Sequence, residues 1–209
     1  MALETISKPA AKQATSAAGG VKLKPMRIGE TILRTRKYEE MRSWYRLALS
    51  AEPTVEVTVD PTAGGPRQDI ARVCFFRVHV DYPFAQVLGL FEIPDLQDSA
   101  VRQPGLDHVM FRDGSLAELF QRYETLKAAG YRPTYSYNHG PGTSFYYKDP
   151  EGNLIELAAV NFADESDYLA YFRTDAYKKN FDGIQIDPEE YLARFKSGVP
   201  VEELVRIPA

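Results

Sequence analysis

The chain has 209 residues, of which 44% are hydrophobic and 26% are charged, and its formal net charge is −4. This composition is typical of a globular protein that buries one sizeable core or two small cores sharing an interface. The negative charge argues against nucleic-acid binding, because no basic excess is present to release counterions from phosphates. No apolar run approaches the length of a membrane-spanning helix, so we expect no membrane partner.

Two features bear on where the protein works. The first 24 residues are rich in Ala, Lys, Ser and Gly and lack the apolar segment of a secretory signal, so residues 1–24 are interpreted as a flexible arm. The single cysteine, Cys74, lies in an apolar run and has no partner for an internal disulfide. This indicates a buried, inert thiol in a reducing compartment. Together these features predict a cytoplasmic protein.

The first half of the chain has the predicted order β-α-β-β-β. The helix is recognised by apolar side chains that recur on one face, and the second strand by alternation of apolar and polar residues. A loop with glycines and prolines, at residues 60–69, precedes the last two strands. The five elements are predicted at residues 26–35, 37–49, 53–59, 70–78 and 84–93.

The second half repeats this order, at residues 106–112, 115–130, 131–137, 143–149 and 154–160. Its helix has Ser115 as a predicted N-cap, Glu118 three residues later and Gly130 just beyond its end. Agreement in order and spacing across five elements predicts a duplicated module. Glu30 and His108, 78 positions apart, mark equivalent places in the two copies.

The expected fold class is therefore α+β, with two paired βαβββ modules that form a cupped mixed sheet. The modules are predicted at residues 25–100 and 104–162, within one unit at 25–162. Residues 163–209 differ in composition and are interpreted as a helical extension packed on the sheets. Helical patterns within it lie at residues 164–180, 188–198 and 201–206.

Two stretches of the second module carry a resemblance. LDHVMF opens the module and YYKDPEGNLIEL closes it. Both resemble the vicinal oxygen chelate superfamily, which includes glyoxalase I, fosfomycin-resistance proteins and the type I extradiol catechol dioxygenases. The longer stretch NHGPGTSFYYKDPEGNLIELAAVNF, residues 138–162, most resembles the small extradiol branch. The resemblance covers residues 26–206 and implies a metal in the cup between the modules.

The resemblance implies that His108 and Glu156 are metal ligands, with Glu30 at the equivalent position of the first module. The residue pattern agrees for Glu156, because it alternates with apolar Ile155 and Leu157 and so faces away from them. A carboxylate in such a strand needs water, a partner or a metal. By pattern alone, His108 could equally be a structural or surface histidine, and Glu30 a surface glutamate.

The chain departs from the extradiol pattern in its ligand set. That branch usually holds Fe(II) with two histidines and one carboxylate, whereas this chain would supply one histidine and two carboxylates. The second carboxylate makes the site harder, which favours Mn(II) or Mg(II) relative to the usual set, although Fe(II) remains the expected metal. Glyoxalase I takes a further ligand from the last strand of its first module. Gly89 occupies that place here, so three protein ligands and open positions are expected.

The resemblance also implies that His139 and Tyr146 line the pocket, bond the substrate oxygen or an oxygen-derived intermediate, and move protons. An imidazole suits this role because it titrates near neutrality. Asn138 and Ser144 are expected to contact the substrate. By pattern alone, His139 could be an exposed loop residue and Tyr146 a core residue. His79, the remaining histidine, is interpreted as structural or surface.

The first functional hypothesis is a metal-dependent extradiol-type dioxygenase that cleaves the ring of a small catecholic or phenolic compound. It would use dioxygen, serve the catabolism of aromatic compounds and assemble as a homodimer or higher homo-oligomer. The second is a non-oxidative member of the superfamily, an isomerase, lyase or hydrolase in which a divalent metal is a Lewis acid. The third is a metal-free protein that binds an aromatic ligand.

Overall fold

The computed structural model describes residues 28–60, 62, 69–79, 86–97, 106–180 and 182–207. The arm predicted at residues 1–24 and most of the loop predicted at 60–69 lie outside these residues. In the part of the chain that the structure describes, no helix is long and apolar enough to cross a membrane.

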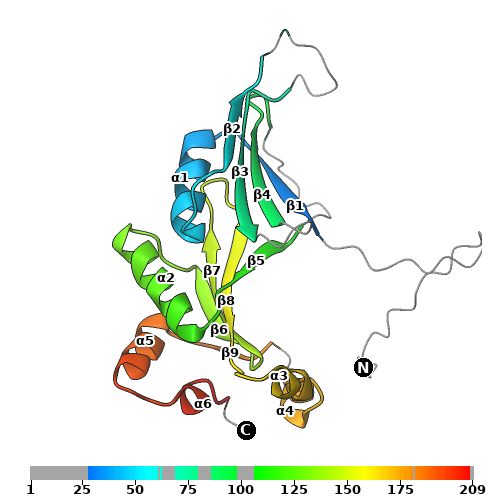
Figure 1. Cartoon of the computed structure of the whole chain (residues 1–209). Helices are drawn as coiled ribbons and strands as arrows, with labels where there is room; N and C mark the ends of the chain where they lie inside the picture. Colours follow the sequence, from blue (N-terminus) through cyan, green and yellow to red (C-terminus); the bar gives the residue numbers. More distant parts are fainter. Residues whose placement is uncertain are drawn as a thin grey trace, which may run out of the picture.

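The first module forms a four-stranded sheet with one helix on its face (Figure 1). The strand order is β1-β4-β3-β2, and β1 runs parallel to β4 while the other neighbours are antiparallel. The helix packs on the sheet through its predicted apolar face, where Met41, Trp44 and Tyr45 are almost completely buried. The elements are β1 (Glu30–Thr35), α1 (Tyr38–Leu49), β2 (Val55–Thr58), β3 (Arg72–His79) and β4 (Gln86–Glu92).

The second module repeats this topology with the strand order β5-β8-β7-β6, and β9 (Ile184–Gln185) of the C-terminal extension adds a fifth strand beside β6. Its helix begins as predicted: Ser115 Oγ accepts the Glu118 N–H at 3.2 Å, and Glu118 Oε2 accepts the Gly114 N–H at 2.8 Å. Gly130 follows with a positive φ of 89°. The elements are β5 (His108–Arg112), α2 (Leu116–Ala128), β6 (Tyr135–Asn138), β7 (Gly142–Lys148) and β8 (Leu154–Val160). The predicted α+β class with paired βαβββ modules is confirmed.

The C-terminal extension contains a strand that the sequence did not predict. It comprises α3 (Glu165–Tyr171), α4 (Asp175–Lys179), β9 (Ile184–Gln185), α5 (Pro188–Lys196) and α6 (Val201–Leu204). The helix predicted at 164–180 is divided, and Thr174 Oγ1 caps the start of α4. β9 pairs with β6 at the free edge of the second sheet. A two-residue strand is too short to show alternation, which is why no pattern indicated it.

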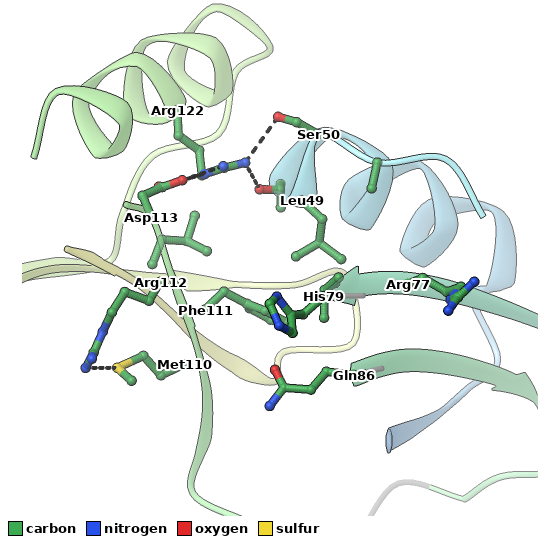
Figure 2. Close-up of a pocket in the computed structure, with 14 residues that line it drawn as sticks. Leu49, Ser50, Arg77, His79, Gln86, Met110, Phe111, Arg112, Asp113 and Arg122 are labelled. Atoms are coloured by element: carbon green, nitrogen blue, oxygen red, sulfur yellow. Dashed lines mark hydrogen bonds and ion pairs between the residues drawn. The ribbon is translucent and has the colours of Figure 1, made fainter. Parts of the chain in front are cut away.

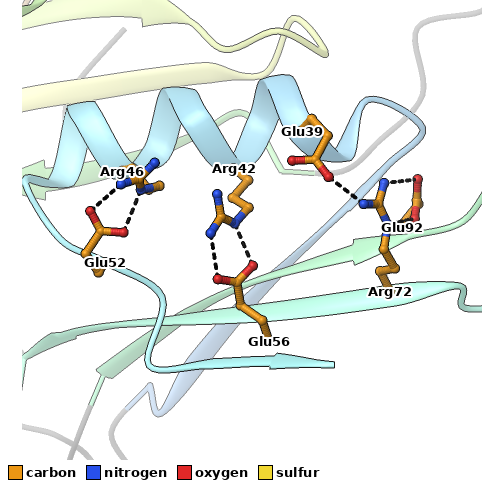
Figure 3. Close-up of polar contacts among 7 residues, drawn as sticks. All are labelled: Glu39, Arg42, Arg46, Glu52, Glu56, Arg72 and Glu92. Atoms are coloured by element: carbon orange, nitrogen blue, oxygen red, sulfur yellow. Dashed lines mark hydrogen bonds and ion pairs between the residues drawn. The ribbon is translucent and has the colours of Figure 1, made fainter. Parts of the chain in front are cut away.

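The two modules share one hydrophobic core, which includes side chains of α1, α2 and both sheets. Cys74 is fully buried in it, as predicted. Within the first module, arginine–glutamate pairs connect α1 with the sheet and the following loop (Figure 3). All except the partly buried Arg72–Glu92 pair are exposed, and exposed pairs typically add little stability each. The pairs are Arg42–Glu56, Arg46–Glu52, and Arg72 with Glu39 and Glu92.

The turn before β8 fastens the second module to the first. Glu151 Oε1 accepts the Thr35 hydroxyl at 2.7 Å and the backbone N–H groups of Arg36 and Lys37 at 2.7 and 3.1 Å. These groups lie between β1 and the start of α1. Asp149 Oδ2 accepts the buried Tyr45 hydroxyl at 3.0 Å. The DPEGN turn therefore fixes the beginning of β8 against the first module.

A second connection lies at the other end of α1 (Figure 2). Arg122 in α2 forms an ion pair with Asp113, with Nη2 2.5 Å from Oδ1. The same guanidinium donates to the Ala48 carbonyl at 2.6 Å and to Ser50 Oγ at 3.1 Å. The Ala48 carbonyl belongs to the last turn of α1, where a cation is favoured by the helix dipole. Arg122 thus links the two helices of the two modules.

Candidate metal and catalytic site

Glu156, Tyr146 and Ser144 lie on one face of the second sheet. Ile155 and Leu157 of β8 are buried in the core beside α2, so Glu156 between them points to the opposite face. Tyr146 of β7 is the register partner of Glu156, and Ser144 lies two residues before it on the same face. The alternation predicted for Glu156 is therefore what the structure shows.

His108 and Glu156 contact each other on this face. His108 Nε2 lies 3.0 Å from Glu156 Oε2, and Ser144 Oγ donates to Glu156 Oε1 at 2.6 Å. Glu156 is buried, with 7% of its surface exposed, while the His108 side chain is 36% exposed. On the other ring nitrogen, His108 Nδ1 lies 2.8 Å from Asp107 Oδ2. The histidine is thus held between two carboxylates.

The spacing of this pair suits two neighbouring ligands of one metal ion. Two donors about 2.1 Å from an ion and at right angles to each other are about 3.0 Å apart. That is the separation of His108 Nε2 and Glu156 Oε2. The Ser144 hydroxyl donates a hydrogen bond to Oε1, so Oε2 is the oxygen of this carboxylate that could bind a metal ion. The Asp107 carboxylate lies at the other ring nitrogen of His108, and a carboxylate in this position typically orients a histidine that binds a metal.

The structure does not bring Glu30 into a cluster with this pair. Among the described residues, no three His, Cys, Asp or Glu side chains lie close enough together to form a metal site. Glu30 is the exposed first residue of β1, in the other sheet. It nevertheless lines the same cavity of about 310 Å³ as His108. A ligand role for Glu30 thus stays a prediction that requires its side chain to turn toward His108.

His139 and Tyr146 form the second pair of this face. His139 Nε2 lies 3.0 Å from the Tyr146 hydroxyl, and the Tyr146 ring also makes an edge contact with His108. Burial and the nearby Glu156 carboxylate raise the pKa of Tyr146, so its phenol stays protonated near neutral pH. Tyr135 stacks on Tyr146 with 4.5 Å between ring centroids. Tyr146 therefore contacts both His139 and His108, and so connects the candidate catalytic residues with the candidate metal ligands.

Asn138 is placed elsewhere than predicted. It is fully buried at the end of β6, and its Nδ2 donates to the Val205 carbonyl at 2.7 Å and to the Tyr191 hydroxyl at 3.2 Å. Its Oδ1 accepts the Gly140 N–H at 2.9 Å. With these groups engaged, Asn138 fastens the 139–141 loop to the C-terminal extension and does not reach the site. Ser144 does reach the site, where its hydroxyl bonds Glu156.

Two residues near the site had no prediction. Asp107 precedes His108 directly, and an acidic neighbour of a candidate ligand is a signal that the sequence offers. Asp182 contributes only its backbone carbonyl, which lies 2.6 Å from His139 Nδ1. A backbone contact has no side-chain signature, so the sequence offers no comparable signal for it.

Another cavity, of about 730 Å³, lies where the modules meet (Figure 2). Its lining includes the basic side chains of Arg77, His79, Arg112 and Arg122, and none of the candidate ligands or catalytic residues. His79 is exposed at the end of β3, consistent with its interpretation as structural or surface.

Comparisons with known proteins agree with this fold. The sequence model of the Glyoxalase/Bleomycin resistance protein/Dioxygenase superfamily matches residues 27–157. Biphenyl-2,3-diol 1,2-dioxygenases 2 and 3 of Rhodococcus globerulus are each 28% identical to the chain, over 178 and 180 residues, which cover 85% of this chain and 86% of theirs. A glyoxylase/bleomycin resistance protein/dioxygenase domain from Frankia sp. EAN1pec, at 19% identity, gives a TM-score of 0.52 over 66% of this chain and 99% of its own.

A second solved structure at this level is a mutant fosfomycin resistance protein of Listeria monocytogenes, complexed with Mn(II) and a dihydroxypropylphosphonic acid. It is 17% identical, has a TM-score of 0.50, and covers 71% of this chain and 99% of its own. At these identities the two structural likenesses support the fold alone.

Proposed function

Because the chain belongs to the glyoxalase/bleomycin resistance protein/dioxygenase superfamily, we propose that it is a metal-dependent extradiol-type dioxygenase. Its substrate would be a small catecholic or phenolic compound. The names of the two Rhodococcus globerulus relatives, which are biphenyl-2,3-diol dioxygenases, support this choice. Within the chain, the observation that carries the proposal is the contact of His108 Nε2 with Glu156 Oε2 at the separation of two neighbouring metal ligands.

His108, Glu156 and Glu30 would hold Fe(II). When bound, the ion would supply a Lewis acid for the two oxygens of the diol and electrons for the reduction of dioxygen. Asp107 would accept the Nδ1–H of His108, which keeps the Nε2 lone pair free for the ion. Ser144 would hold the Glu156 carboxylate in place through Oε1.

Tyr146 and His139 would handle the protons of the reaction. The Tyr146 phenol is protonated and lies next to both Glu156 and His139, so its oxygen could accept the proton of a substrate hydroxyl bound near His108 while its own proton passes to His139 Nε2. His139 Nε2 can hold the proton that such an oxygen loses or return it later. The two residues thus act as an acid–base pair beside the candidate metal ligands.

The surface around this pair suits an aromatic ligand. Tyr135 stacks on Tyr146, and Tyr137 stacks on His139 with 5.4 Å between centroids. Tyr135 and Tyr137 are only partly buried, which leaves ring surface for a ligand to contact. Aromatic pairs prefer offset or edge-on packing, and both geometries are offered by this cluster.

The first experiment is a metal titration of the anaerobically purified chain. Fe(II) should bind with a stoichiometry near one per chain in the wild type, and His108→Ala and Glu156→Gln should abolish that binding. His79→Ala is the matched control, since it removes a histidine that lies on another cavity, and it should bind as the wild type does. Full metal content in His108→Ala would refute the ligand assignment.

The second experiment tests the reaction. The Fe(II)-loaded chain should consume dioxygen in equimolar amounts with a catechol and yield a ring-opened product. Tyr146→Phe and His139→Gln should lower kcat by about 10²-fold or more while Fe(II) still binds, because they remove proton transfer and no ligand. Absence of dioxygen uptake with a panel of mono- and bicyclic catechols would contradict the proposal.

The Glu30 carboxylate favours a second candidate function. A site with one histidine and two carboxylates is harder than the usual extradiol set, and hard ligands suit Mn(II) or Mg(II). The chain would then be a non-oxidative isomerase, lyase or hydrolase of the superfamily. Turnover that requires Mn(II) or Mg(II) and proceeds without dioxygen would select this function.

Tight binding of an aromatic compound by a chain that takes up no metal would instead indicate a metal-free binding protein.

A further inference from the structure

The C-terminal extension reaches the candidate acid–base pair through one backbone contact. His139 Nδ1 lies 2.6 Å from the carbonyl oxygen of Asp182. A carbonyl oxygen can only accept a hydrogen bond, so Nδ1 must carry the proton. A neutral imidazole has a single N–H, and Nε2 therefore presents its lone pair to the Tyr146 hydroxyl, 3.0 Å away. In this tautomer the Tyr146 hydroxyl donates a hydrogen bond to His139 Nε2.

The opposite tautomer would reverse the chain of hydrogen bonds. With the proton on Nε2, His139 would donate to the Tyr146 oxygen, and the Tyr146 proton would turn away from it. Glu156 lies beside Tyr146 as its register partner and would be the alternative acceptor. The tautomer of His139 hence decides whether the Tyr146 proton is directed toward the histidine or toward the candidate metal ligand.

Several contacts hold the Asp182 carbonyl in place. β9 pairs with β6 immediately after this position, with Gln185 opposite Tyr137. On the preceding side, Asn180 Oδ1 accepts the Gly183 N–H at 3.0 Å, and Asn180 Nδ2 donates to the Gly183 carbonyl at 2.7 Å. The carbonyl is thus fixed from both sides along the chain.

Gly183 is the residue that permits the close approach. Its φ is +85°, a conformation that favours glycine. A Cβ at this position would lie 2.1 Å from the Asn138 carbonyl oxygen and 2.5 Å from His139 Cα. Both obstacles are backbone atoms, which cannot move aside as a flexible side chain can. A methyl group at 183 would push the 182–185 segment away from His139.

We propose that residues 182–185 of the C-terminal extension are a positioning element for His139. The Asp182 carbonyl fixes the Nδ1–H tautomer, and so directs the Tyr146 proton to Nε2 and away from Glu156. The role in catalysis rests on the proposed function, whereas the tautomer itself is a property of the metal-free chain.

The test is NMR of the metal-free chain labelled with 15N-histidine. The chain has three histidines, so the ring signals are few, and a His139→Gln variant identifies those of His139. The wild type should show the Nδ1–H tautomer at His139. Gly183→Ala should lose it, with a shift to the Nε2–H form or to a mixture. Gly198→Ala is the matched control, because Gly198 has a φ of +86° in the same extension but nothing within 4 Å of a new Cβ.

A second variant covers the case in which Gly183→Ala fails to fold. Asn180→Ala removes the two side-chain bonds to Gly183 without adding an atom, and it should weaken the preference for the Nδ1–H tautomer. An Nε2–H tautomer in the wild type, or an unchanged tautomer in folded Gly183→Ala, would overturn the proposal. The NMR measurements of the His139 tautomer need neither metal nor turnover, so their outcome does not depend on whether the chain is a dioxygenase. If that assignment holds, Gly183→Ala should also lower kcat by about 10²-fold with KM unchanged.

Discussion

Gly89 in β4 occupies the place that Glu156 occupies in β8. In each module the first strand runs parallel to the last, and each of these two residues lies two positions beyond the register partner of the marked residue on the first strand. The register pairs are Glu30 with Val87 in the first module and His108 with Leu154 in the second. The equivalence comes from backbone pairing, and it agrees with the place assigned to Gly89 from the sequence.

The first module therefore offers no donor where the second offers a carboxylate. A Cβ at Gly89 would lie 2.5 Å from Ile32 Cδ1 and 3.1 Å from the Phe75 ring, so neighbouring apolar side chains already fill this space. Phe75 pairs with Gly89 as Tyr146 pairs with Glu156. The two modules thus have the same topology and different side chains at this place, and Glu30 is the only ligand predicted from the first module.

The identity of residue 30 should set the metal preference. Glu30→His would create the two-histidine, one-carboxylate set, and imidazole suits Fe(II) better than a carboxylate does, whereas carboxylates suit Mn(II). We expect the Fe(II)-to-Mn(II) affinity ratio to rise by about tenfold or more, which is about 1.4 kcal/mol. Anaerobic competition titration measures it. Glu40→His makes the same change at an exposed position of α1 and should leave the ratio as it is.

Ser144→Ala should weaken metal binding without removing a ligand. The hydroxyl bonds Glu156 Oε1 at 2.6 Å, and loss of such a supporting contact typically lowers metal affinity by about 10–100-fold. The control is Ser136→Ala in the neighbouring strand β6. The Ser136 hydroxyl is buried and has no hydrogen-bond partner among the described residues, so its removal should leave metal affinity unchanged and stability equal or higher. Equal metal affinity in Ser144→Ala and wild type would contradict the role of Ser144.

Much of the fold was accessible from sequence because its signals are local. The apolar stripe with Trp44 and Tyr45 marks α1, and the Ser115–Glu118 pair marks the start of α2. Repetition of the same five elements then gives the pairing of the modules. β9 was not accessible, since its two residues are ordered by pairing with β6 rather than by their own pattern.

The site was accessible in part for the same reason. Alternation in β8 orients Glu156, and the parallel pairing of β5 with β8 brings His108 beside it. Asn138 was expected to contact the substrate, but it ends β6 and faces the buried side, because alternation with Tyr137 continues to that residue. The Asp182 carbonyl and the partners of Glu151 are long-range contacts, and no local pattern specifies those.

Glu151 should make the stability depend on pH in the acid range. Burial by itself would raise the pKa of Glu151, but the Thr35 hydroxyl and the N–H groups of Arg36 and Lys37 outweigh it and lower the pKa. A group whose pKa is lowered on folding stabilises the fold above its unfolded pKa, about 4.5, and this contribution is lost as the pH falls through the folded value.

Glu151→Gln should therefore lower the free energy of unfolding by about 1.5–3 kcal/mol at neutral pH. The difference from the wild type should shrink as the pH is lowered below about 4.5, because the wild-type carboxylate is then progressively protonated. Urea titrations across this range measure it. Glu40→Gln, on the exposed face of α1, should give a small difference that does not vary in this way. If the difference in unfolding free energy between Glu151→Gln and wild type does not change with pH, the charge of Glu151 does not contribute to its contact with the first module.

The link between α1 and α2 should contribute measurably to stability because it is partly buried. The Asp113 side chain is 7% exposed and that of Arg122 is 20% exposed, and the guanidinium also donates to the Ala48 carbonyl. Asp113→Asn leaves the Arg122 charge without its counter-ion, which should cost about 1.5–3 kcal/mol. The exposed Asp175–Lys178 pair, with Asp175 86% exposed, provides the comparison: Asp175→Asn should change stability by about 0.5 kcal/mol or less. Denaturant midpoints with an unchanged m-value would give both differences, and equal midpoints for the two variants would mean that the modules do not depend on this contact.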